Sequence, residues 1–206
     1  FGGAGILLTA PIGCGKTTLL MQLARDPAFT LLADDTPLTD RLGNIHPFPL
    51  LVRLGENSPF LENFRTDSLR PFKRRHYPPK YLVPCPSRGP DGPRVTRCSR
   101  LFLLKRSGGA PIIKKARLPE AAFELLRSLV VGAGVPQMAE YFLRPELSDV
   151  LAKARILGSR VRTAMALLRN CEPFRFYLSA EPESNARALK SFLAALPAAN
   201  APGKML

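Results

Sequence analysis

Residues 10–17, Ala-Pro-Ile-Gly-Cys-Gly-Lys-Thr, have the types and spacing of a phosphate-binding loop, with Ala10 in place of the usual first glycine. The two glycines allow backbone torsions that turn successive N–H groups toward one anion, and a following helix would point its positive end there. Lys16 can reach the β- and γ-phosphates of a nucleotide, and the Thr17 hydroxyl can ligate Mg²⁺. The pattern therefore predicts nucleotide binding. The residues expected to line the phosphates are Gly13, Cys14, Gly15, Lys16, Thr17 and Thr18.

Two adjacent carboxylates, Asp34 and Asp35, follow an apolar run at residues 29–33. Carboxylates at the carboxyl end of a strand lie at the edge of an open α/β sheet where ligands bind. One carboxylate can ligate Mg²⁺, and a second can accept a proton from an attacking hydroxyl. The alternative is that the pair only caps a turn before Pro37. Their place after a phosphate-binding loop favours the catalytic interpretation.

The hydrophobic pattern indicates the elements that must position these residues. The apolar runs at residues 5–9 and 29–33 are typical of buried parallel strands, and residues 17–25 show one apolar helical face. Residues 45–54 look extended, although their prolines exclude a central strand. Further strands are expected at 99–104, 111–113 and 174–178, and helices at 119–129, 147–154, 156–168 and 182–196. This order predicts a layered α/β domain.

Length and composition limit the protein class. The 206 residues fit one sizeable domain, and 46% hydrophobic with 22% charged residues is typical of a globular protein. No apolar run approaches the roughly 20 residues that span a bilayer. The first residue is Phe1 rather than Met, so we expect part of the natural chain to precede it. Four cysteines without CxxC spacing indicate neither a disulfide framework nor a zinc site, and predict reduced thiols in a cytoplasmic protein.

Positive charge is concentrated in one region. The formal net charge is +14, and residues 64–106 hold 12 basic side chains against two acidic ones. Such a field attracts anions of any kind. Seven prolines at residues 71–93 predict a loop, in which the cluster Lys73-Arg74-Arg75 either clamps a phosphoryl group or acidic acceptor, or is simply solvated. The basic stretch has no aromatic ladder for stacking bases, which disfavours nucleic acid as a partner.

Residues 5–54 carry a resemblance to a known family. The stretches GILLTAPIGCGKTTLL, LLADD and GNIHPFPLLVRL resemble HPr kinase and its related P-loop serine kinases. Residues 101–126 and 166–196 loosely resemble the ends of HPr-kinase-related proteins, some of which are found with peptide-modifying enzymes. The resemblance implies an α/β P-loop kinase core related to phosphoenolpyruvate carboxykinase. It further implies a single domain over residues 1–206, with a nucleotide-binding core at 1–70, a basic Pro-rich loop at 71–98 and a small C-terminal α/β part at 99–206.

The resemblance also implies an activity and site roles. It implies an ATP- and Mg²⁺-dependent kinase that phosphorylates a serine of a peptide or small protein, as a peptide-tailoring kinase would. Lys16 and Thr17 would hold phosphate and metal, Asp34 would accept the serine proton, and Asp35 would face the metal. The stretch with which the bifunctional enzymes bind HPr is not recognisable, so HPr is not the expected acceptor. An acidic acceptor fits the basic charge, and a homo-oligomer is compatible with the sequence.

A different class of function remains open from the residues alone. A P-loop protein can act as a nucleotide switch, or as an ATPase associated with nucleic acid, without kinase activity. A motor ATPase usually has a catalytic glutamate after its acidic strand, whereas Asp35 is followed by Thr36. The adjacent aspartates therefore favour the kinase.

Overall fold

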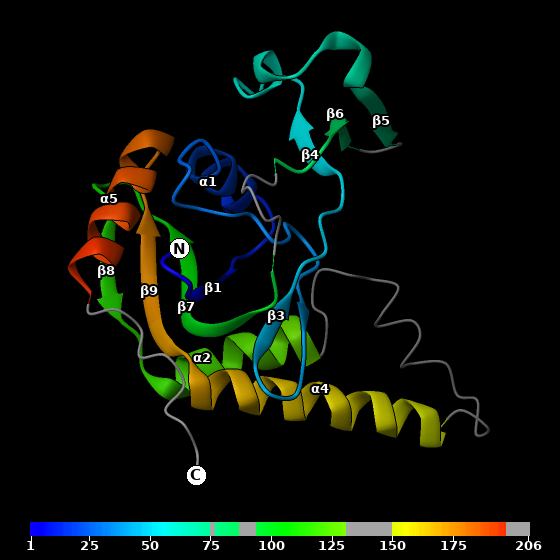
Figure 1. Ribbon diagram of the computed structural model, residues 1–206, viewed down its shortest axis with the longest axis vertical. Coiled ribbons are helices and arrows are strands. Elements are labelled where there is room, and N and C mark those ends of the chain that lie inside the picture. The colour runs from blue at the N-terminus through cyan, green and yellow to red at the C-terminus, as the bar shows by residue number, and fades with distance from the viewer. Residues whose placement is uncertain (75–76, 87–93, 131–149, 197–206) are drawn as a thin grey trace.

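The computed structural model describes residues 1–74, 77–86, 94–130 and 150–196. In this part of the chain, helices cover both faces of a large sheet, and a smaller sheet lies beyond helix α1 (Figure 1). This arrangement confirms the α/β class that the sequence predicts. No helix within the described ranges is long and apolar enough to cross a membrane.

The large sheet brings together strands that are far apart in sequence. Among the described residues it has six strands, in the order β2-β3-β7-β9-β8, with β1 paired to β7. Strands β1, β7 and β9 are parallel to one another, and β8 is antiparallel to β9. The strands are β1 (Gly5–Thr9), β2 (Leu38–Thr39), β3 (Asn44–His46), β7 (Thr96–Arg106), β8 (Ile112–Lys115) and β9 (Glu172–Leu178).

Strand β7 forms the middle of the large sheet and is buried on both faces. Phe102 and Leu104 join one hydrophobic cluster, whereas Leu101 and Leu103 join the cluster on the opposite face. Alternate side chains of a strand point to opposite faces, so a strand covered on both sides must be apolar throughout. Its first residues pair with β3, and later residues pair with β1 along the same edge.

Two pairs of helices cover the sheet. Helices α1 (Lys16–Leu23) and α5 (Pro182–Ala195) pack over one face, where Leu19, Leu23 and Leu189 are buried. Helices α2 (Leu118–Leu125) and α4 (Val150–Asn170) cover the other face, and a π-helical turn at Leu126–Val130 extends α2. Pro182 lies in the first turn of α5, where its missing N–H costs no hydrogen bond.

A three-stranded antiparallel sheet forms a separate layer, which we call the small sheet. It consists of β4 (Val52–Gly55), β5 (Arg70–Arg74) and β6 (Tyr77–Val83) in the order β4-β6-β5. Short 3₁₀ helices occur at Leu61–Asn63 and Thr66–Ser68. Its core residues Val52, Leu54 and Phe60 pack with Met21 of α1. The Arg25 guanidinium lies 4.9 Å from the centre of the Phe60 ring, so the small sheet is anchored to the end of α1.

The prediction of a strand at residues 29–33 was wrong. The segment follows the expected alternation, with Phe29 and Leu31 buried and Thr30 exposed, but it forms no ladder with β1. The Phe48 N–H donates to the Leu32 carbonyl oxygen at 2.8 Å. The hydrophobic pattern from which a strand was expected therefore reflects the burial of these side chains and not a ladder with β1.

The prediction of a loop over residues 71–93 was wrong for its first half, because β5 and β6 lie there. These prolines lie at positions where a strand can accommodate a residue without an N–H donor. Pro71 is on β5, an edge strand, where one side of the backbone needs no partner. Pro78 and Pro79 precede the part of β6 that pairs with β4, which begins at Lys80. Residues 87–93 of the predicted loop lie outside the described residues.

The two helices predicted at 147–154 and 156–168 form the single helix α4. Neither glycine nor proline interrupts residues 150–157, and Arg155 is a good helix former, so nothing ends the helix there. Residues 147–149 lie outside the described residues. The remaining strands and helices occur where the pattern predicts them, within a few residues at each end.

Candidate functional site

Residues 10–17, the predicted phosphate-binding loop, run from the end of β1 into the start of α1, where the sequence places them. Gly13 and Gly15 have φ angles of 76° and 100°, which are left-handed conformations that favour glycine. The Cys14 N–H donates to the Pro11 carbonyl at 3.1 Å and closes the turn. Helix α1 starts at Lys16, directly after Gly15, so its N-terminal N–H groups open onto the loop. Thr18 lies in this first turn.

Lys16 connects the loop to both aspartates. Its Nζ lies 2.8 Å from the Asp34 carbonyl oxygen, 2.9 Å from Asp35 Oδ1 and 3.2 Å from Asp34 Oδ1. The first two contacts are hydrogen bonds, and the third is an ion pair. A phosphate that binds Lys16 therefore competes with two carboxylates for this ammonium group.

Thr17 is paired with Asp34 and not with Asp35. The Thr17 hydroxyl lies 3.2 Å and 3.1 Å from the two carboxylate oxygens of Asp34. The Asp34 side chain is only 7% exposed. A hydroxyl and a carboxylate are the hard oxygen ligands that Mg²⁺ prefers, and Mg²⁺ usually adds substrate phosphates and waters to one or two such groups. This pair therefore fits that ion. No group of three or more His, Cys, Asp or Glu side chains suited to a metal occurs in the described ranges.

Asp35 lies between two cations and is more accessible, with 44% of its side chain exposed. Lys16 contacts one of its oxygens, and Arg53 Nη2 donates to the other. Partial burial of Asp35 would raise its pKa, but the hydrogen bonds and charges of Lys16 and Arg53 outweigh burial and lower the pKa below its ordinary value. Asp35 is thus an ionised carboxylate that solvent and ligands can reach.

Two arginines at the site were missed by the sequence interpretation. Arg53 comes from β4 of the small sheet, and no local sequence pattern indicates that this strand lies beside Asp35. Arg106 ends β7, and its Nε lies 3.4 Å from the Cys14 carbonyl. A signal existed for Arg106, because parallel strands bring their carboxyl ends to one edge, and this predicted strand is followed by Lys105 and Arg106.

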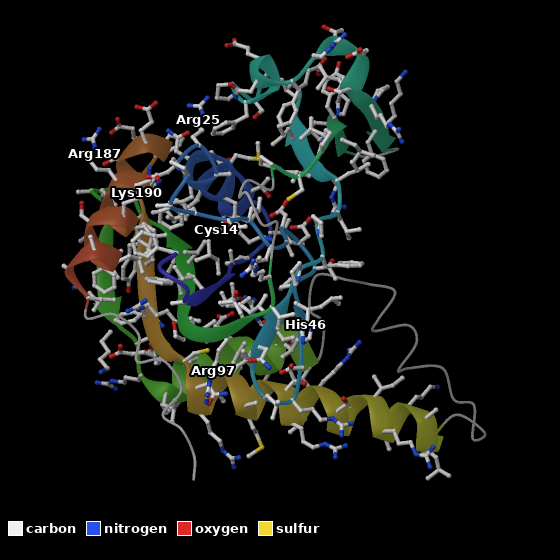
Figure 2. All side chains as sticks on the ribbon, viewed as in Figure 1. Cys14, Arg25, His46, Arg97, Arg187 and Lys190 are labelled. Atoms are coloured by element: carbon white, nitrogen blue, oxygen red, sulfur yellow. The ribbon has the colours of Figure 1, made fainter. Side chains whose placement is uncertain are left out.

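The nearby cysteines are not suited to act as nucleophiles. Burial raises the pKa of the Cys14 thiol, although the Arg106 charge opposes this effect. Burial, followed by the negative charge of Asp34, raises the pKa of Cys85 to about 11. Both thiols are therefore protonated at neutral pH. Cys14 contributes backbone groups to the loop, and its side chain packs into the core (Figure 2).

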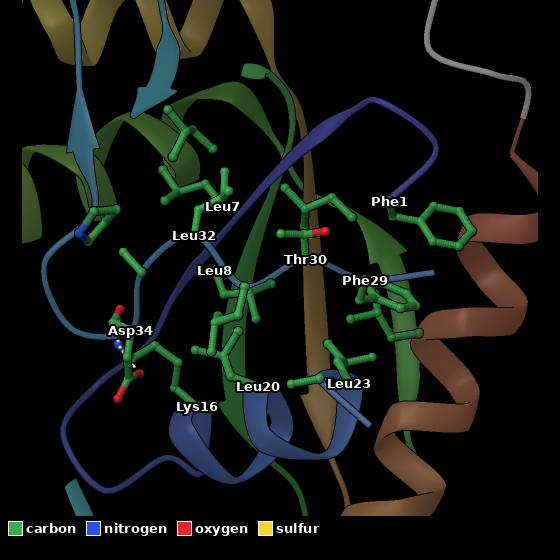
Figure 3. Close-up of a pocket in the computed structure, with 17 residues that line it drawn as sticks. Phe1, Leu7, Leu8, Lys16, Leu20, Leu23, Phe29, Thr30, Leu32 and Asp34 are labelled. Carbon is green, nitrogen blue, oxygen red and sulfur yellow. Dashed lines mark hydrogen bonds and ion pairs between the residues drawn. The ribbon is translucent and has the colours of Figure 1, made fainter. Parts of the chain in front are cut away.

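An apolar cavity of about 100 Å³ lies between β1 and the segment that leads to Asp34. Figure 3 shows Lys16 and Asp34 at one end of it and Phe1 and Phe29 at the other. The cavity is lined by Phe1, Ile6, Leu7, Leu8, Lys16, Leu20, Leu23, Ala24, Phe29, Thr30, Leu31, Leu32, Ala33, Asp34, Pro37, Ile45 and Leu189. The cavity lies beside residues 29–33, where the predicted strand forms no ladder with β1.

Neither His46 nor the basic residue Lys73 belongs to this centre. His46 Nε2 is 3.0 Å from Asp40 Oδ2, in a turn that Asp40 also stabilises by accepting from the N–H groups of Leu42 and Asn44 (Figure 2). Lys73 is exposed on β5. Arg75, in the same predicted cluster, lies outside the described residues. The structure thus brings Lys16, Thr17, Asp34 and Asp35 together and leaves the histidine out.

Comparison with protein-family models, with curated proteins and with solved structures found no match.

Proposed function

We propose that this protein is an ATP- and Mg²⁺-dependent kinase that transfers the γ-phosphoryl group to a serine hydroxyl of a peptide or small protein. The observation that carries this proposal is the cluster of Lys16, Thr17, Asp34 and Asp35 beside a glycine-rich loop. It contains a cation for phosphate, two oxygen ligands for a metal and one accessible carboxylate. A site that only binds phosphate has no need of the second carboxylate.

The contacts favour exchanging the two roles, metal binding and proton acceptance, that the family resemblance implies for the aspartates. Thr17 shares its hydroxyl with Asp34, which is nearly buried, so these two residues would hold Mg²⁺. When bound, Mg²⁺ neutralises charge on the phosphates and withdraws electrons from them. Asp35 is exposed, ionised and close enough to Lys16 to lie near the terminal phosphate. We therefore assign proton acceptance to Asp35.

In the proposed reaction, the serine oxygen forms a new bond to the γ-phosphorus while the bond from that phosphorus to the β–γ bridging oxygen breaks. The serine proton passes to Asp35, and ADP leaves with the bridging oxygen. Lys16 and the N–H groups at the start of α1 face the negative charge of the phosphates. Positioning and electrostatics supply most of the acceleration in such transfers, so no covalent enzyme intermediate is required.

The acceptor class follows from charge. The protein has a net charge of +14, and the small sheet presents exposed basic residues such as Arg70 and Lys73. Such a surface raises the local concentration of an acidic peptide. Acidic residues near the target serine are therefore expected to lower the Michaelis constant of the acceptor.

The direct test incubates the protein with ATP, Mg²⁺ and a library of serine-containing peptides that differ in net charge, and then locates phosphate by mass spectrometry. A matched library with threonine or alanine at the target position serves as control. Phosphoserine in acidic peptides supports the proposal. ATP hydrolysis without phosphorylation of any peptide would instead indicate a nucleotide switch, and would refute the kinase proposal.

A further inference from the structure

Asp35 has two cationic contacts, and one of them is with Lys16. In the proposed reaction the nucleotide phosphates also bind Lys16, so they compete with Asp35 for this lysine. The Lys16 ammonium donates to the Asp34 carbonyl oxygen and to Asp35 Oδ1, and it also lies 3.2 Å from Asp34 Oδ1. When the β- and γ-phosphates arrive, they compete with these oxygens for Lys16. The Asp34 contacts are the more protected, since that side chain is 7% exposed and is also bound by Thr17. The exposed contact with Asp35 is the one that a phosphate can replace most easily.

Arg53 is placed to hold Asp35 after that exchange. Its guanidinium donates to Oδ2, whereas Lys16 contacts Oδ1, so the two cations do not compete for one oxygen. Arginine stays protonated over the whole useful pH range. Its charge is therefore available to Asp35 whether or not a nucleotide is bound.

The backbone of Arg53 is fixed independently of the phosphate-binding loop. It lies on β4 between Val52 and Leu54, which are buried in the core of the small sheet at 1% and 3% exposure. Alternation along the strand turns Arg53 away from that core, and its backbone pairs with Leu82 of β6. The small sheet thus presents one arginine to the edge of the large sheet where the aspartates lie.

We propose that Arg53 is the positioning residue for Asp35, and that it keeps this carboxylate oriented toward the acceptor hydroxyl while Lys16 binds the phosphates. This inference rests on the proposed kinase function. It gives the small sheet a role in the reaction besides attracting acidic peptides, because the sheet supplies the anchor of the proton acceptor.

The test compares Arg53→Gln and Arg53→Lys with the parent protein, and uses Arg65→Gln as the matched control. Arg65 belongs to the same part of the chain, is 86% exposed and pairs with Asp67. We expect Arg53→Gln to lower kcat about 10–100-fold with the KM for ATP changed less than about twofold, as for other residues that orient a reacting group. Arg53→Lys should restore part of kcat, because it keeps one charged donor. Arg65→Gln should match the parent.

A readout of Asp35 itself separates positioning from a merely structural role. We would determine crystal structures of the parent and of Arg53→Gln in complex with Mg²⁺ and a non-hydrolysable ATP analogue. We expect Arg53 to keep its contact with Asp35 Oδ2 in the parent complex, and the Asp35 carboxylate to change its orientation in Arg53→Gln. Melting temperatures of all variants check that the fold is retained.

Each outcome decides between the two proposals. If the parent phosphorylates peptides and Arg53→Gln does so at the parental rate, the positioning role is wrong and the kinase stands. If the parent phosphorylates nothing, the kinase is wrong, and the crystal structures still decide whether Arg53 holds Asp35. An Asp35 carboxylate that keeps its orientation in Arg53→Gln overturns the inference in either case.

Discussion

The division of roles between the two aspartates can be tested by replacing each with asparagine. Both changes keep the size of the side chain and remove one negative charge. If Asp34 holds Mg²⁺ with Thr17, Asp34→Asn should raise the Mg²⁺ concentration for half-maximal transfer at least 10–100-fold, the range seen when groups around a metal are altered. Saturating Mg²⁺ should then recover much of the rate. Asp35→Asn should lower transfer about 10²–10⁴-fold at every Mg²⁺ concentration, the scale of general base catalysis.

The contacts of Asp34 also set an expected cost in stability. Lys16 Nζ lies 3.2 Å from Asp34 Oδ1, which gives a Coulomb attraction of about 5 kcal/mol at an effective dielectric constant of about 20. Desolvation of both groups cancels much of that attraction, and Asp35 at 2.9 Å still neutralises Lys16 in the variant. We therefore expect a net loss of about 1–3 kcal/mol, in the range for hydrogen bonds to charged groups. This loss lowers Tm by about 2–4 °C per kcal/mol.

The assay measures initial rates of peptide phosphorylation against Mg²⁺ concentration, at a temperature well below the Tm of each variant. Asp26→Asn is the matched control, because Asp26 pairs with Lys190, away from the loop. The opposite pattern, with Mg²⁺ rescuing Asp35→Asn and not Asp34→Asn, would refute the assignment made from the contacts. It would restore Asp34 as the base.

The other predictions concern the loop, a turn and a strand pair. Lys16→Ala should abolish transfer and weaken ATP binding, because the phosphates lose their nearest cation; isothermal calorimetry and the peptide assay check this, and parental turnover would exclude the loop from the reaction. Asp40→Asn should destabilise the fold by about 1–2 kcal/mol at pH 7. Partial burial would raise the pKa of Asp40, but bonds from His46, Asn44 and Leu42 hold it below its ordinary value. Its stabilisation is therefore complete above about pH 4 and falls at lower pH, so denaturant curves of parent and variant should converge in acid, and a constant gap would contradict this account. Gly5→Ala should cost about 1–3 kcal/mol, since its Cβ would lie 2.6 Å from the Arg97 carbonyl oxygen, whereas Gly108→Ala has open space and should be nearly neutral in thermal melts. Equal melting temperatures for the two glycine variants would contradict the close approach.

Sequence reasoning found the parts of the site that local chemistry determines. The glycine torsions at 13 and 15, the helix that starts at Lys16 and the closeness of the aspartates follow from residue types and spacing. It could not find contacts made by distant strands. Arg53 reaches Asp35 only because β4 packs through Met21 onto α1, and no periodicity encodes that packing.

The errors in secondary structure also have physical causes. Proline frequency suggested a loop at 71–93, but an edge strand tolerates proline, and so does a strand segment without a partner on one side. The apolar pattern at 29–33 indicated a strand, and the segment buries the expected side chains without pairing to β1. Patterns of burial predict which residues are inside more reliably than they predict hydrogen-bond ladders, because burial is a property of single residues and a ladder needs a partner.

The parallel pairing of β1 with β7 has a consequence for synthesis and folding. The strand that carries the phosphate-binding loop pairs with a strand made much later, and the contact between Arg106 and Cys14 spans 92 residues. Such long-range pairing closes a large loop and is slow to form. During translation, β1 therefore remains unpaired until β7 has left the ribosome. Its apolar side chains remain uncovered during that time. The proposed nucleotide site therefore forms late, and chains that stop before β7 should neither bind ATP nor escape recognition by chaperones.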